Sequence, residues 1–136
     1  MRRVRVEELC ARLKVPHGHR ELAILAARYH TLVHRALELK PATLLTLLED
    51  CDALRRPERF AELLLACEAD ARGRGGREHE PYPQAAYVRL ALAAATAVTL
   101  SEEERHGLEG RAIGERLRAK RLAAITAAKA QAAAAL

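Results

Sequence analysis

The apolar residues of this chain are mostly leucine and alanine, and they recur at the three- and four-residue spacing of a helix face. The clearest example is the run of Phe60, Leu63, Leu64 and Cys67. Half of the 136 residues are hydrophobic, yet only 3% are aromatic and tryptophan is absent. β-branched residues are too few to build the strands of a sheet. The sequence therefore predicts an all-α protein.

Proline and glycine divide the chain into about six helical segments. We expect helices at Arg5–Lys14, Arg20–Leu39, from Pro41 through Cys51, from Pro57 to the glycines after Arg72, at Gln84–Val98, and from Arg111 to about Ala130. Ser101 and Glu104 have the spacing of a capping box. The longest irregular stretch runs from Gly73 to Pro83. It predicts a front bundle at residues 1–76 and, at 77–136, a tail that ends in an extended helix.

The basic excess of the chain is almost entirely arginine. Net charge is +5, and by count along the sequence there are 19 arginines and 4 lysines. The planar donor fork of arginine suits phosphate, so a polyanionic partner is one interpretation. A GC-rich coding sequence produces the same excess without any such partner, so composition alone does not decide between the two.

The three cysteines favour a reducing compartment. Cys10, Cys51 and Cys67 are odd in number, lie within helical patterns and have no C-x-x-C spacing, which predicts reduced, buried thiols. No apolar run reaches the length of a membrane span. We therefore expect a cytoplasmic protein with no membrane partner.

A carboxylate at the end of the fourth segment stands out as a candidate functional group. Asp70 continues the apolar stripe of its helix by one turn, so the pattern predicts that it is buried and needs a partner. A metal ion and Arg74, four residues on, are the two candidates, and the residues leave both open. Glu68 and Arg72 have the spacing of a separate ion pair.

Two histidines one helical turn apart are the second candidate. The i, i+4 spacing of His30 and His34 puts both rings on one helix face, where they can chelate a transition metal. The alternative is that His30 is a packed, hydrogen-bonded core histidine and that His34 is solvated.

Two basic clusters are candidates for RNA binding. The first is Arg72, Arg74 and Arg77 among three glycines, and the second is Arg111, Arg116, Arg118, Lys120 and Arg121 at the start of the last helix. No aromatic residues alternate with these positions, so we expect phosphate contacts rather than base recognition. For the second cluster, a solvated helix partly balanced by Glu115 is the alternative.

A family resemblance rests on the order of several short segments. LCARLKVP, ARYHTLVHRALEL, ALRRPERF, CEADARGR, PYPQ and GLEGRAIGERLRAKRLAAI follow one another from about Val6 to Lys129. Together they resemble the C-terminal part of bacterial multifunctional CCA-adding enzymes, which are tRNA nucleotidyltransferases. The resemblance implies the end of a metal-dependent HD phosphohydrolase domain, followed by a tail that approaches tRNA.

The same resemblance implies a partial metal site. Asp70 looks like the last metal ligand of the HD domain, and His30 would face the same site. In the full-length family, the resemblance implies that this metal is Mg or Ni. The chain contains no His-Asp dipeptide and no match to the nucleotide-adding head. We therefore expect no catalytic residues, no cofactor of its own and no activity from the chain alone.

Three functions follow as hypotheses. The first is a tRNA-binding module of a CCA-adding enzyme that lacks the nucleotidyltransferase head. The second is a fragment that joins a separately encoded head and restores activity in trans. The third is a helical protein–protein interaction module with no RNA role.

Overall fold

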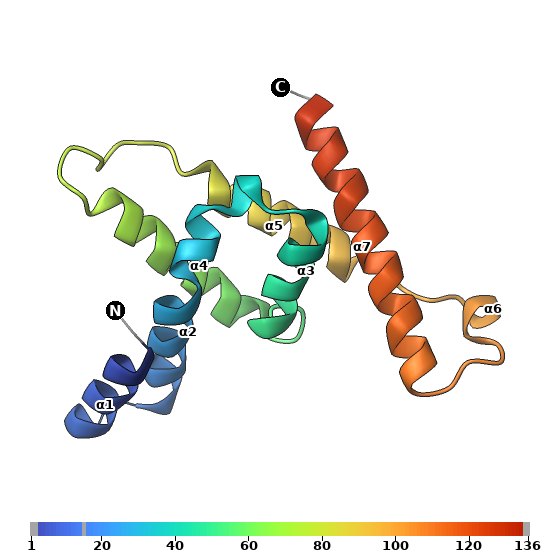
Figure 1. The fold of residues 1–136 in the computed structure, drawn as a ribbon, viewed down its shortest axis with the longest axis horizontal. Coiled ribbons are helices and arrows are strands. Elements are labelled where there is room, and N and C mark those ends of the chain that lie inside the picture. Colours follow the sequence, from blue (N-terminus) through green and yellow to red (C-terminus); the bar gives the residue numbers. More distant parts are fainter. Residues whose placement is uncertain (1–2, 15, 135–136) are drawn as a thin grey trace.

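The computed structural model describes residues 3–14 and 16–134, and the all-α prediction is confirmed (Figure 1). This part of the chain contains no strand. The elements are α1 (Arg3–Leu13), α2 (His17–His34), the 3₁₀ turn η1 (Ala36–Glu38), α3 (Pro41–Asp50), α4 (Pro57–Arg72), α5 (Pro83–Thr96), α6 (Glu102–Arg105) and α7 (Arg111–Ala134).

Local sequence signals account for most helix starts. Pro41, Pro57 and Pro83 each lie in the first turn of a helix, where the missing N–H of proline costs nothing. The predicted capping box is confirmed, because the Ser101 hydroxyl accepts a hydrogen bond from the Glu104 N–H at 3.1 Å and the Glu104 carboxylate accepts one from the Ser101 N–H at 3.2 Å. It opens the single-turn helix α6, an element beyond the six expected.

The second helix differs from its prediction at both ends. It begins at His17 rather than Arg20, and it ends at His34 rather than Leu39. Proline disfavours helical geometry at the residue before it, and Lys40, which precedes Pro41, is extended with ψ of 152°. The chain therefore leaves the α-helix before residue 40, through the short η1 turn.

One apolar core extends over both sides of the α4–α5 loop. Its most buried members include Leu48 and Leu64 from before the loop and Val88 and Ile125 from after it. Helix α2 packs against α4, while α5 contacts α7, α3, η1, α2 and α4. The domain boundary between residues 76 and 77 stays a prediction, because the core is continuous across it.

The cysteines are reduced and buried, as predicted. Burial raises the pKa of the Cys51 thiol to about 12 and that of Cys67 to about 11, so both remain protonated near neutral pH. None of the described helices is long and apolar enough to cross a membrane.

Candidate nucleic-acid interface

The first predicted cluster surrounds a pocket between the end of α4 and the start of α5. The pocket has a volume of about 360 Å³ and is lined by His34, Ala71, Arg72, Arg74, Arg77, Glu80, Pro81, Tyr82 and Gln84. All three arginines expected from the sequence therefore line one cavity. We call it the arginine pocket.

The loop geometry explains how Arg74 and Arg77 come together. The Arg77 N–H donates to the Arg74 carbonyl at 3.0 Å, which closes a four-residue turn. Gly76 is the third residue of this turn and has a φ of 84°, a conformation that glycine adopts without strain. The two arginines thus stand at the two ends of one tight turn.

Arg72 has a different role from its neighbours. Its guanidinium makes the predicted ion pair with Glu68 at 3.2 Å, and its Nε donates to the Glu80 carbonyl at 3.1 Å. It therefore ties the last turn of α4 to the far side of the loop. Within the described chain, Arg74 and Arg77 have no carboxylate within ion-pair distance, so their charges remain available to a ligand.

His34 joins three helices at the wall of the arginine pocket. Its Nε2 lies 2.8 Å from Asp70 Oδ2 on α4, and its Nδ1 lies 2.7 Å from the Tyr82 hydroxyl at the start of α5. A carboxylate accepts, so the ring donates through Nε2, and Nδ1 of a neutral ring then accepts from the hydroxyl. Gln84 Nε2 also donates to the His34 carbonyl at 3.0 Å. These bonds fix the pocket wall.

Two sequence expectations about this wall were wrong. Asp70 is not buried: its side chain is 48% exposed, and Cys67 is the last fully buried residue of α4. Its close partner among the described residues is His34 rather than Arg74, and the metal alternative stays a prediction. The packed-histidine interpretation predicts a solvated His34, yet its side chain is only 21% exposed and both ring nitrogens are hydrogen-bonded.

The charge state of Asp70 follows from these contacts. The hydrogen bond from His34 is the largest cause that lowers the pKa of Asp70, with smaller contributions from the charges of His30 and Arg74. Burial raises the pKa of the Tyr82 hydroxyl, so it stays protonated as a hydrogen-bond donor.

The metal prediction for Asp70 and His30 stays a prediction. Both residues line a second, mostly apolar cavity of about 380 Å³ between α1, α2 and α4. His30 Nδ1, however, is bonded to the Ala26 carbonyl at 2.8 Å, as in the packed-histidine interpretation. Among the residues described, no group of three or more His, Cys, Asp or Glu could hold a metal ion. A tight divalent site needs more ligands than these two, so the described residues do not fit one by themselves.

In the second predicted cluster, Arg118 and Lys120 connect α7 to other elements of the fold. Arg118 Nε donates to both carboxylate oxygens of Glu49 at 3.1 and 3.2 Å, which joins α7 to α3. Lys120 donates to the Thr99 carbonyl at 2.7 Å and to Glu104 at 2.8 Å, which joins α7 to the segment around α6. Their charges are largely compensated within the chain.

The remaining members of this cluster are more available. Arg111 pairs with Glu115 at 3.0 Å, but both side chains are highly exposed, and such surface pairs contribute little. Arg116 is exposed and has no ion pair in the described structure. Arg121 is partly buried, and its Nε lacks a partner among the described residues. The balancing role proposed for Glu115 is thus confirmed for Arg111 only.

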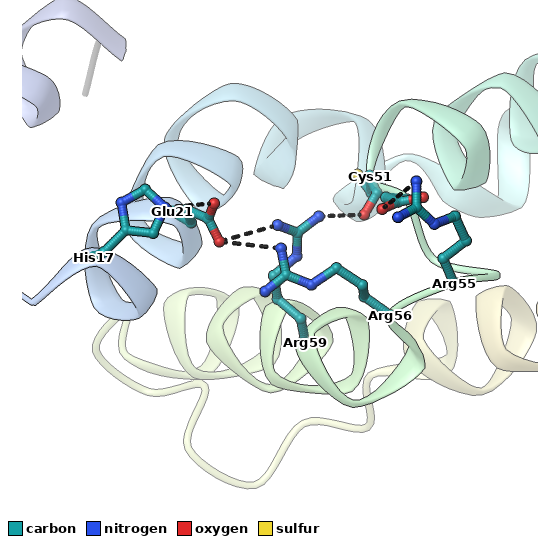
Figure 2. Close-up of polar contacts among 7 residues, drawn as sticks. His17, Glu21, Cys51, Arg55, Arg56 and Arg59 are labelled. Atoms are coloured by element: carbon teal, nitrogen blue, oxygen red, sulfur yellow. Dashed lines mark hydrogen bonds and ion pairs between the residues drawn. The ribbon is translucent and has the colours of Figure 1, made fainter.

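A third arginine group, which the sequence did not single out, has a structural role (Figure 2). Glu21 accepts from Arg56 at 3.1 Å and from Arg59 at 3.4 Å, and Arg59 also donates to the Cys51 carbonyl at 2.9 Å. The hydrogen bond from Arg56 is the main cause that lowers the pKa of Glu21. These contacts fasten α4 to α2 and to the end of α3.

The two candidate clusters lie far apart. Figure 1 shows the α4–α5 loop near one end of the long axis and the start of α7 near the other. Helix α5, with 14 residues, lies between them and spans about 20 Å at 1.5 Å per residue. An RNA partner would therefore meet two separate basic regions rather than one continuous patch.

Comparison with known proteins finds relatives that share the sequence of this chain over most of its length. A protein of Nitrosococcus oceani is 56% identical over 117 residues, or 86% of this chain and 29% of the relative. A protein of Thioalkalivibrio sulfidiphilus is 52% identical over 126 residues, which are 93% of this chain and 31% of the relative. A protein of Xanthomonas oryzae is 51% identical over 124 residues, which are 91% of this chain and 30% of the relative. Each of these relatives is named "Multifunctional CCA protein".

The match is partial in length. The chain spans about 30% of each of these relatives. No family model matches it, and no solved structure matches it.

The contacts of Asp70 predict a specific energetic coupling. In a double-mutant cycle of Asp70→Asn and His34→Gln, we expect a coupling of about 0.5–1 kcal/mol, reduced from that of a buried pair because Asp70 is half-exposed. The matched cycle of Asp70→Asn with Arg74→Ala should couple by less than about 0.5 kcal/mol. Urea unfolding at pH 7 measures both, and the reverse order of the two couplings would contradict the geometry.

The lowered carboxylate pKa values predict loss of stability in acid. Asp70 and Glu104 have folded pKa values below their unfolded values of about 3.9 and 4.3, and that of Glu104 is about 2. Their stabilisation is present above the unfolded values and is lost as pH falls through the folded ones. Asp70→Asn and Glu104→Gln should each flatten the dependence of the urea midpoint on pH between about 4.3 and 2. An unchanged slope in both variants would count against these contacts.

Proposed function

Because the chain belongs to the multifunctional CCA protein family and spans about 30% of its relatives, we propose that it is a tRNA-docking module of a CCA-adding enzyme. The observation that carries this proposal is the arginine pocket, where Arg74 and Arg77 remain unpaired in the described structure. Phosphate is the ligand group that such guanidinium pairs suit.

The contacts of this module are with the RNA backbone rather than the bases. Base recognition in single-stranded RNA uses exposed aromatic rings, whereas Tyr29, Phe60 and Tyr82 are buried here. The exposed arginines at the two ends of α5 instead offer charge and planar hydrogen-bond donors. Binding is therefore sensitive to salt and tolerant of tRNA sequence.

A protein partner is the second candidate, and a specific observation favours it. Leu13 and Leu65 are more than half exposed, and Leu9 lines the apolar cavity between α1, α2 and α4. Single exposed leucines are common on protein surfaces, so it is the apolar cavity beside Leu9 that favours a surface covered by another polypeptide. The partner would be a separately encoded nucleotidyltransferase head, or an unrelated protein if the module has no RNA role.

The first prediction is salt-sensitive binding to tRNA. Mobility-shift titration at low salt should give micromolar affinity, and raising monovalent salt from 50 to 200 mM should weaken binding by about tenfold or more, as expected for a few phosphate contacts. Unrelated tRNA sequences should bind within about threefold of one another because no base is read. A basic protein of similar size and charge is the control. Binding no tighter than that control would refute the tRNA-docking function.

The second prediction concerns nucleotide addition. The chain alone should incorporate no CMP or AMP into tRNA from CTP and ATP, because no described group of carboxylates can position the two metal ions of phosphoryl transfer. Incorporation of labelled nucleotide into a tRNA that lacks its CCA end is the measurement. Any template-free addition by the pure chain would show that it carries catalytic residues of its own.

A further inference from the structure

The arginine pocket has the properties of a formed ligand site rather than of a charged surface. Its volume of about 360 Å³ lies within the usual range for small-molecule sites, roughly 300–1,000 Å³. A single nucleotide fits such a volume, whereas an RNA duplex contacts a surface. The pocket therefore suits one local group of a ligand.

The charges that line this pocket favour an anion. Three guanidiniums line it against one carboxylate, that of Glu80. Arg72 is compensated by Glu68, but Arg74 and Arg77 have no ion pair within the described chain. The nearby carboxylate of Asp70 accepts from His34 at 2.8 Å instead. Arg74 and Arg77 lie at the two ends of one tight turn. Their guanidinium groups can therefore reach the same anion.

The wall of the arginine pocket at the start of α5 also favours an anion. It is formed by Pro81, Tyr82 and Gln84, which lead into the 14-residue helix α5. The residue that caps this helix, Tyr82, makes no side-chain hydrogen bond to the first-turn amides. Free amides and the helix dipole make a helix start favourable for negative charge.

The walls are held in place before any ligand binds. Tyr82 and Asp70 both bond to the ring of His34, and Gln84 bonds to its carbonyl. Arg72 in turn spans the loop to the Glu80 carbonyl. Little ordering is needed on binding except in the side chains of Arg74 and Arg77.

The geometry points to a binding site for one phosphate group of a nucleotide, held between Arg74 and Arg77 in the arginine pocket. The phosphate comes either from an RNA backbone or from a free nucleotide. The inference deepens the proposed function and rests on it only for the RNA source. It also assigns the two clusters unequal roles, because much of the α7 cluster is used within the fold.

Paired variants test this assignment. Arg74→Ala/Arg77→Ala should weaken tRNA binding by about tenfold at low salt and reduce the magnitude of the log–log salt slope by about 1.5, as expected for two lost phosphate contacts. Arg74→Lys/Arg77→Lys keeps the charge, so it should keep most of the slope. The control is Arg5→Ala/Arg12→Ala on α1, where both side chains are exposed, and it should change affinity by less than about threefold. Unchanged urea midpoints establish that the variants fold.

Titration calorimetry with CMP and with inorganic phosphate identifies the source. If the protein binds CMP and the Arg74→Ala/Arg77→Ala variant does not, the pocket is a site for a free nucleotide. If this variant loses affinity only for tRNA, the pocket is a site for the RNA backbone. If tRNA binds, but this pair behaves like the α1 control and CMP does not bind, the site is refuted while the tRNA-docking function survives. If CMP binds through the two arginines but tRNA does not bind, the site stands and the docking function fails.

Discussion

The burial of the small-residue face of α5 is the constraint on which the rest of the structure depends. Ala85, Val88, Ala91 and Ala95 are at most 3% exposed, and their short side chains allow close approach of neighbouring helices. Helix α5 contacts α7, α3, η1, α2 and α4. Its first turn forms a wall of the arginine pocket, and its last turn leads toward α6 and α7. The position of α5 therefore sets the separation of the two basic ends (Figure 1).

The same chain uses its arginines in two different ways. Arg59 and Arg118 bridge helices through the carboxylates of Glu21 and Glu49. Arg74, Arg77 and Arg116 have no such partner in the described structure. The net charge of +5 is therefore not spread evenly over the surface. In the docking function that we propose, tRNA is the polyanion and these unpaired arginines are the places where it binds.

Features set by residues a few positions apart could be predicted from the sequence. The helices, the capping box of Ser101 with Glu104 and the pair of Glu68 with Arg72 depend on spacing alone. The partners of His34 lie 36 and 48 residues away, and Arg118 meets Glu49 across 69 residues. No local pattern encodes such contacts, so the spacing of the two histidines favoured a solvated His34, and the sequence around Arg118 gave no sign of its bond to Glu49. The metal prediction for Asp70 and His30 stays a prediction, because two ligands alone do not make a tight divalent site.

The most direct test of the account is to map the tRNA contact on the chain by NMR, using amide shifts of the ¹⁵N-labelled protein during titration with tRNA. We expect the largest shifts at residues 73–84 and a second, weaker set around Arg116, because these regions hold the unpaired arginines. Shifts confined to the residues around Leu9 on α1 and Leu65 on α4, with none at residues 73–84, would contradict it.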